Sequence, residues 1–134
     1  RQGLAVLASI MGEGPHQGLV AYAATEDLQN VLFTTPIYTR KFENIKKNPH
    51  VSLLIDNRKN TERDFLDCAA ITVRGEAVIE DKEKHKDYTR LYLMRHPYLE
   101  QFLKSPSSAI IRVRVSSYTL VTSFQHVREW SPGA

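Results

Sequence analysis

The sequence holds few of the features that fix a chain covalently or place it in a membrane. Its 134 residues contain one cysteine, Cys68, so no disulfide can form within the chain. No apolar run approaches the roughly 20 residues of a membrane-spanning helix, and no signal-peptide pattern is present. These absences predict a cytoplasmic protein, without a membrane partner, that folds around one hydrophobic core in a reducing compartment.

The sequence also lacks a strong charge of either sign. Its net charge is +3 and its pI about 9.1, which is too mildly basic for a nucleic-acid-binding tail. A nucleic-acid-binding barrel needs aromatic residues interleaved with cations on one strand face. Residues 108–115 carry Arg112 and Arg114 but no aromatic side chain, so we expect no nucleic-acid partner. The length and the 42% hydrophobic content suit one domain over residues 1–134.

No familiar catalytic or metal-binding pattern is present. The sequence has no Gly-x-Ser-x-Gly elbow, and we see no residue that must act as a general acid or base. No two histidines are four residues apart, and no cysteine or carboxylate completes a ligand set, so we expect no metal site. The five histidines are His16, His50, His85, His96 and His126. Only His126 is singled out for testing.

Short β-prone runs separated by turn residues make up most of the chain. Residues 11–17 are expected to turn, residues 57–67 to form a polar loop, and residues 40–48 and 81–96 to form two helices. Residues 98–103 are expected to add a further turn, and residues 125–134 to form a tail. Strands are predicted at 3–10, 18–25, 30–35, 51–56 and 69–80, with one or two more within 108–124. This pattern predicts a β-dominated α+β protein with an antiparallel barrel of about six or seven strands and two helices.

Side-chain periodicity gives more detailed expectations for three of these elements. In the first helix Phe42 and Ile45 share a face, and in the second Asp81 is expected to cap and Tyr88, Leu91 and Tyr92 to form the apolar stripe. In the strand 69–80, Gly75 interrupts the alternation and is predicted to mark a bulge. The residues expected on the inner face of that strand are Ile71, Val73, Ala77 and Ile79.

The charges at the start of the first helix point to an anion site. Thr39 is a suitable N-cap, but Arg40 and Lys41 then add positive charge where the helix dipole is already positive. Glu43 comes one position too late to form a capping box. One explanation is that both cations point into water at a solvated turn. The other is a bound phosphate, held by the free backbone N–H groups, Arg40 and Lys41, which would make the positive charge at the helix start favourable.

The surrounding motif resembles that of a known family. The order VLFTTP…TRK…N…NP…VSLLID, over residues 31–56, is similar to the signature of the FMN-binding split barrels, the pyridoxamine 5′-phosphate oxidase-like and flavin reductase-like superfamily. The similarity extends in order over nearly the whole chain. It implies an antiparallel split β-barrel and a homodimer whose cofactor lies at the subunit interface.

The resemblance also implies roles for particular residues. Thr39, Arg40 and Lys41 would hold the FMN phosphate, and Thr34 and Thr35 would lie beside the ribityl chain. Asn57 and Arg58 would belong to a loop that approaches the cofactor. Trp130 would either cover a flavin, which in a two-subunit site could be that of the partner, or cap an edge of the core. The strand residues expected along the isoalloxazine ring are Leu19, Val20, Ala21 and Tyr22.

Two departures narrow the expected activity. The family's vitamin B6 oxidases carry cations on the first cofactor-binding strands, where this chain reads LVAYAAT, and a C-terminal Arg-x-His that HVREW does not match. We therefore expect an FMN-dependent oxidoreductase that passes hydride or electrons between a donor and an unidentified small molecule. The alternatives are a flavin-binding or electron-transfer protein without turnover, and a split barrel that uses the deazaflavin F420 or handles haem.

Overall fold

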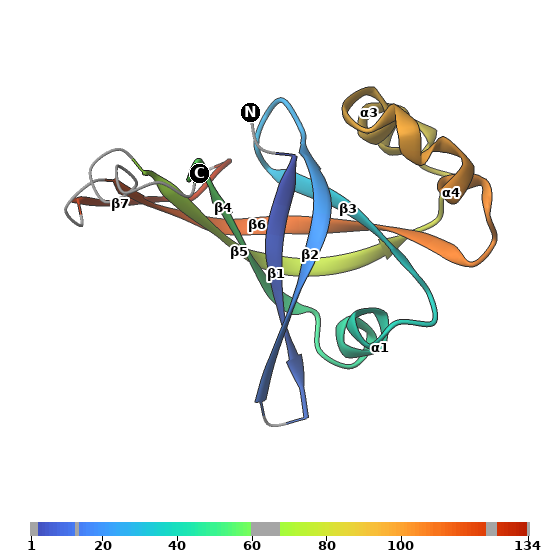
Figure 1. Ribbon diagram of the computed structural model, residues 1–134, viewed down its shortest axis with the longest axis horizontal. Coiled ribbons are helices and arrows are strands. Elements are labelled where there is room, and N and C mark those ends of the chain that lie inside the picture. The colour runs from blue at the N-terminus through green and yellow to red at the C-terminus, as the bar shows by residue number, and fades with distance from the viewer. Residues whose placement is uncertain (1–2, 13, 60–67, 123–125, 134) are drawn as a thin grey trace.

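Six antiparallel strands close into a barrel, and a seventh strand extends it on one side (Figure 1). The computed structural model describes residues 3–12, 14–59, 68–122 and 126–133. In the sheet the order is β3-β2-β1-β4-β5-β6-β7, and pairing between β3 and β6 closes the barrel. The strands are β1 (Leu4–Met11), β2 (Gly14–Ala24), β3 (Asn30–Pro36), β4 (His50–Asp56), β5 (Ala70–Glu80), β6 (Ser108–Thr122) and β7 (His126–Trp130). The predicted fold class, a β-dominated antiparallel split barrel, is confirmed.

Apolar side chains, which alternate with polar ones along the strands, fill the barrel. Leu7, Phe33, Leu53 and Val73 are at most 1% exposed and come from four different strands. On β6 the residues Ile111, Val113 and Val115 point inward as predicted, and their arginine neighbours point outward. Every fully buried side chain removes apolar surface from water, which is the main favourable contribution to folding.

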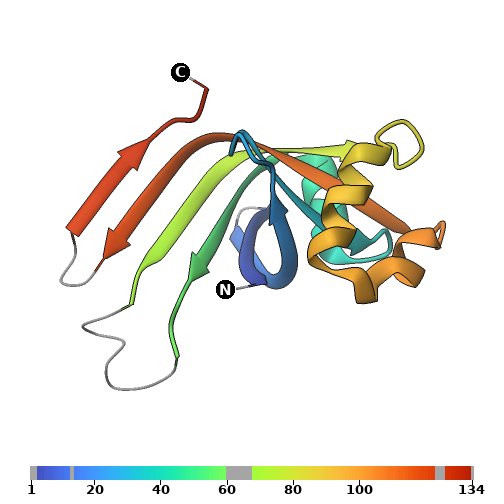
Figure 2. The same cartoon turned by 90° about the horizontal axis from the view of Figure 1, so that it is seen from above.

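Three α-helices and one 3-10 turn accompany the described strands, one α-helix more than predicted. Helix α1 (Arg40–Lys47) lies at one end of the barrel and inserts Phe42 and Ile45 into the core, as their spacing predicted. Helix α3 (Lys86–Arg95), the turn η1 (Pro97–Leu99) and helix α4 (Glu100–Lys104) lie together on the outer side (Figure 2). Tyr92 of the predicted stripe is fully buried beneath α3, with Tyr88 and Leu91 packed beside it.

Several predicted boundaries were wrong. Asp81 does not cap the second helix, because α3 begins at Lys86 and the Asp81 carboxylate accepts the Glu83 N–H within a turn before it. The predicted turn at 11–17 is narrower, since β1 and β2 run on to Met11 and Gly14. The expected tail forms strand β7 on β6. Residues 60–67 of the predicted polar loop lie outside the described residues.

Strand β5 confirms the bulge prediction and corrects one burial prediction. The register between β5 and β6 shifts between Arg74 and Gly75, and β6 has Ser116 as its extra residue there. A β-carbon on Gly75 would lie 2.2 Å from the Arg114 carbonyl oxygen, so no larger residue fits. Ile79 was expected inside but is 41% exposed, because this end of β5 runs beyond the enclosed part of the barrel.

Candidate functional site

Thr39 caps helix α1, as predicted, and its hydroxyl is held by the turn itself. The Thr39 Oγ1 accepts the Phe42 N–H at 3.3 Å and donates to the Pro36 carbonyl at 2.9 Å. The Thr35 hydroxyl lies 3.0 Å from the Thr39 Oγ1, and Thr35 is fully buried. These two hydroxyls therefore shape the turn and are not free to donate to a ligand.

The next two residues leave their donors open. The backbone N–H groups of Arg40 and Lys41 have no acceptor in the described part of the chain, as expected for the first turn of a helix. The exposed Arg40 guanidinium donates through Nη1 to the Met11 sulfur at 2.9 Å, a weak acceptor that leaves its remaining donors unused. The start of α1 thus presents two open N–H groups, with the Arg40 guanidinium beside β1 and the Lys41 side chain beside β2, and such donors suit an anion.

Lys41 also brings the turn to strand β2. A β-carbon placed on Gly18 would lie 3.6 Å from the Lys41 Cε, so the lysine stem passes directly over this glycine. Gly18 precedes the segment 19–22 that was predicted to line the cofactor ring. The fold therefore brings together the two segments that the sequence assigned to opposite ends of one cofactor.

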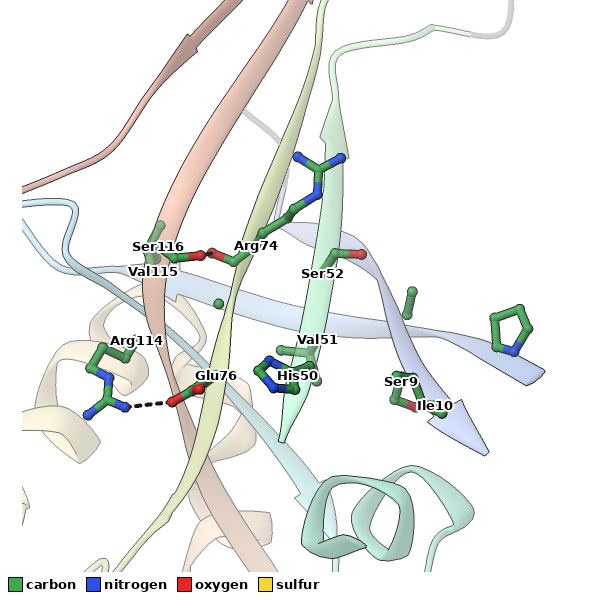
Figure 3. A pocket seen from close by; sticks show the side chains of 13 residues that line it. Ser9, Ile10, His50, Val51, Ser52, Arg74, Glu76, Arg114, Val115 and Ser116 are labelled. Carbon is green, nitrogen blue, oxygen red and sulfur yellow. Dashed lines mark hydrogen bonds and ion pairs between the residues drawn. The ribbon is translucent and has the colours of Figure 1, made fainter. Parts of the chain in front are cut away.

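A hollow beside Arg40 continues into a larger groove. The hollow measures about 570 Å³ and includes Ile10, Arg40 and Asn44 among its lining. The groove measures about 700 Å³, also includes Ile10, and crosses β1, β4, β5 and β6 (Figure 3). At the boundary the buried Asn44 donates to the Ser9 hydroxyl at 3.3 Å, which ties helix α1 to strand β1.

The groove is polar along one wall and positively charged. Arg114 pairs with Glu76 at 2.6 Å, while Arg74 donates to the Thr119 hydroxyl at 3.2 Å (Figure 3). His50 lies between this wall and helix α1 in the same view. Two arginines against one glutamate leave a local excess of positive charge that favours an anionic or polar ligand.

On strand β2, Leu19 alone among the four predicted residues has an exposed side chain, at 64%. Val20 and Tyr22 point into the barrel, so the segment can offer a ligand mainly backbone groups. Helix α3 uses two of these groups. The Tyr92 hydroxyl donates to the Ala21 carbonyl at 2.9 Å, and the His96 Nε2 lies 2.8 Å from the Tyr22 carbonyl.

Tyr92 and His96 form a buried network that sequence reasoning missed. The Tyr92 hydroxyl also lies 3.0 Å from the Thr34 Oγ1, so Thr34 faces α3 and not an open ribityl site. Burial raises the pKa of Tyr92 to about 12, although the hydrogen bond with Thr34 opposes this shift. Tyr92 carried a signal, its place on the apolar stripe, whereas nothing in the sequence pattern distinguished His96 from the other histidines.

The loop residues after β4 have separate roles. Asn57 closes the base of the loop, with its Oδ1 accepting the Ala69 N–H at 2.7 Å. Arg58 pairs with Asp56 at 3.2 Å and lines a hollow of about 190 Å³ together with Leu19. The structure therefore brings Arg58 near the predicted cofactor strand, while Asn57 holds the loop itself.

Strand β7, which carries Trp130, lies away from helix α1 within one chain (Figure 1). Trp130 is 41% exposed, and its ring stacks on that of Tyr118 with centroids 5.2 Å apart. His126 is exposed at the start of the same strand. A role for Trp130 over the partner's cofactor stays a prediction. Within its own chain the Trp130 ring covers the ring of Tyr118.

Two searches of the described residues give no site of another kind. No cluster of three or more histidine, cysteine or acidic side chains in residues 3–12, 14–59, 68–122 and 126–133 is arranged to hold a metal ion. No helix in these ranges has the length and apolar character that crossing a membrane requires. The start of α1, with its open N–H groups, its two cations and its adjoining hollow, is the candidate site.

Comparison with known proteins agrees with the barrel. A family model described as pyridoxamine 5′-phosphate oxidase matches residues 1–122. No curated protein matches the chain. Three solved structures share the fold, and each is similar to this chain over most of its length.

The first is a haem-binding protein from Mycobacterium smegmatis, with a TM-score of 0.85 and 14% identity over 96% of this chain and 52% of that one. A FAD-binding protein from Mesorhizobium loti has a TM-score of 0.70 and 14% identity over 89% and 85% of the two chains. General Stress Protein 26 from Bacillus anthracis has a TM-score of 0.67 and 20% identity over 97% and 91%. The chain spans about half the length of the haem-binding protein, and identities this low show the fold alone.

Proposed function

The chain belongs to the pyridoxamine 5′-phosphate oxidase family, and from that premise we propose that it binds FMN and acts as a flavin-dependent oxidoreductase. The observation that supports this most is the start of α1. There the open N–H groups and cationic side chains of Arg40 and Lys41 adjoin strand β2. A phosphate monoester, which carries charge and several strong acceptor oxygens, matches this set of donors.

The residues of the chain bind and orient the cofactor in this proposal. Lys41 contributes a point charge and Arg40 a planar fork of donors to the phosphate. Leu19 offers an apolar side chain to one part of the ring, and backbone groups of β2 offer hydrogen bonds. A bound flavin supplies the hydride or electron transfer itself. Strand β2 carries no cation, so we infer a substrate other than a vitamin B6 phosphate.

We propose that two copies of the chain form the working unit. Leu19 and Leu54 both pair with Val6 across the sheet and form an apolar row on the outer face of β2, β1 and β4. Leu4, Leu19 and Leu54 are 53%, 64% and 39% exposed and line one hollow. Exposed apolar residues grouped in this way are typical of an interaction surface. A homodimer that covers this row would place the cofactor strand at the subunit interface.

Haem handling is the second candidate. It is favoured by the similarity to the haem-binding protein and by the groove in Figure 3, whose lining includes His50, Arg74 and Arg114. An imidazole can ligate iron, and arginines pair well with carboxylates such as those of a haem. This arrangement would use the groove and leave the cations at the start of α1 without a ligand.

The visible spectrum of the purified protein separates these functions. We expect the absorption of an oxidised flavin and, after heat release, the mass of FMN. A Soret band with released haem would support the second candidate, and the mass of a deazaflavin would exclude FMN. Steady-state oxidation of a reduced nicotinamide by the holoprotein would establish turnover, whereas a flavin that is bound but never reduced would indicate a binding protein.

A further inference from the structure

Helix α3 has a second face that borders a pocket. Tyr88, Leu91 and Tyr92 form the face that packs on the barrel. The second face follows the i, i+3, i+4, i+7, i+8 spacing of a helix. Its members are Lys86, Thr89, Arg90, Leu93 and Met94, and all five line one pocket. Leu93 also packs against the cluster that contains Tyr92 and Leu103, whereas Met94 is exposed.

This pocket lies between α3, α4 and the turn that precedes α3, and it measures about 790 Å³. Leu93, Leu103 and Pro106 give it an apolar lining. Met94, 76% exposed, stands at its opening to solvent. It shares no lining residue with the groove or hollow near α1. Figures 1 and 2 show α3 and α4 together at the end of the molecule away from β7.

Charge around the pocket is unbalanced. Lys104 pairs with Glu100 at 3.7 Å, but Lys86 and Arg90 have no carboxylate partner in the described part of the chain. Lys82 donates to the Leu103 and Ser105 carbonyls at 2.9 Å and to the Ser108 hydroxyl at 2.8 Å, all neutral acceptors. Burial lowers the pKa of Lys82, although the Glu83 carboxylate, which also lines the pocket, opposes this shift. Four cations and two carboxylates, those of Glu83 and Glu100, therefore line the pocket.

The polar atoms of the second face are also unused. Within the described residues, the Thr89 Oγ1 is buried and has no hydrogen-bond partner. A buried hydroxyl without a partner is unusual, because its desolvation is then uncompensated. Thr89 follows Lys86 by three residues and precedes Arg90, so the hydroxyl and two unpaired cations lie within one helical turn of each other.

We propose that this pocket binds an alkyl-chain monoanion, such as a fatty carboxylate. The chain would lie against Leu93, Leu103 and Met94, and the carboxylate would pair with Arg90 and Lys86. An arginine can hold a carboxylate through two parallel hydrogen bonds. No aromatic side chain lines the pocket, which argues against a nucleotide base. Two unpaired cations against one apolar wall match a ligand with one charged end and one apolar end.

Calorimetric titration of the full chain with dodecanoate tests this assignment. We expect one dodecanoate per chain. Acetate, which lacks the chain, and dodecanol, which lacks the charge, should each bind at least about tenfold more weakly, since each loses one half of the contacts. Dodecyl sulfate should still bind, because the site recognises an anionic head. Met94→Glu, which adds a carboxylate at the opening, should weaken dodecanoate binding.

The paired variant Lys86→Ala/Arg90→Ala should weaken dodecanoate binding at least about tenfold, because it removes one or more charge-assisted hydrogen bonds. The variant Lys46→Ala/Arg128→Ala removes the same charge from exposed residues elsewhere and should bind like the wild type. Unchanged affinity in the first pair would overturn the proposal, provided both variants melt at similar temperatures. Absence of dodecanoate binding, equal binding of dodecanol, or capture of an acidic peptide in place of dodecanoate would also overturn it.

Discussion

The hydroxyl of Tyr92 connects three elements through two hydrogen bonds, and its titration should be visible in stability. Phenylalanine at position 92 would leave the part-buried Ala21 carbonyl without its donor, at a cost of about 1 kcal/mol in the free energy of unfolding. Because folding raises the pKa of Tyr92 from 10.0 to about 12, its stabilising contribution is complete below pH 10 and is lost as the pH rises to about 12.

Urea denaturation of the wild type and Tyr92→Phe at several pH values measures this effect. The difference between the two proteins should be largest at neutral pH and should shrink above pH 10. A difference that stayed constant up to pH 12 would show that the Tyr92 hydroxyl is not more acidic in the unfolded chain than in the folded one.

At the residue scale, local signals were predictable and distant partners were not. Thr39 was identified as a cap because its acceptor role depends on a residue three positions away. The bonds of Thr34 to Tyr92, and of His96 to Tyr22, join residues 58 and 74 positions apart. No periodicity in the sequence reports such pairs. The expected ribityl contacts of Thr34 and Thr35 therefore assigned a ligand to hydroxyls that the protein itself engages.

Strand β5 offers a test at the scale of elements. Gly75→Ala should destabilise the protein by about 1–3 kcal/mol, because its β-carbon would lie 2.2 Å from the Arg114 carbonyl oxygen and 2.9 Å from the Val113 Cγ1. The matched control is Gly14→Ala, where a β-carbon meets nothing within 4 Å. Chemical denaturation should find the control within about 0.5 kcal/mol of the wild type. Equal stability of the two variants would mean that the bulge is not tightly closed at Gly75.

Element types were better predicted than element ends. The β5 bulge and the α1 core face follow from a glycine within an alternating pattern and from apolar residues three positions apart. The second helix was expected to begin at Asp81 because aspartate is a suitable N-cap, yet Asp81 forms a turn instead. Residues 126–130 belong to the segment that was expected to form a tail, and all five are exposed. Their strand depends on pairing with β6, which only the folded sheet provides.

The whole molecule should associate through the apolar row on β2, β1 and β4. We expect light scattering of the purified protein to give the mass of two chains. Leu54→Glu, which places a carboxylate in the row, should shift the mass towards one chain and weaken FMN binding, because the proposed site lies at the interface. Met94→Glu introduces the same charge on α3 and should remain dimeric. A dimer unaffected by Leu54→Glu would move the interface elsewhere.

FMN titration of the protein stripped of its ligand tests the central claim most directly, with flavin fluorescence reporting binding. We expect one FMN per chain and a loss of affinity of about tenfold to a hundredfold in Lys41→Ala, as expected when a charge-assisted contact to phosphate is removed. Lys46→Ala, which removes the same charge from the last turn of the same helix, should bind like the wild type. Absence of FMN binding, or equal affinity in Lys41→Ala and the wild type, would contradict the account.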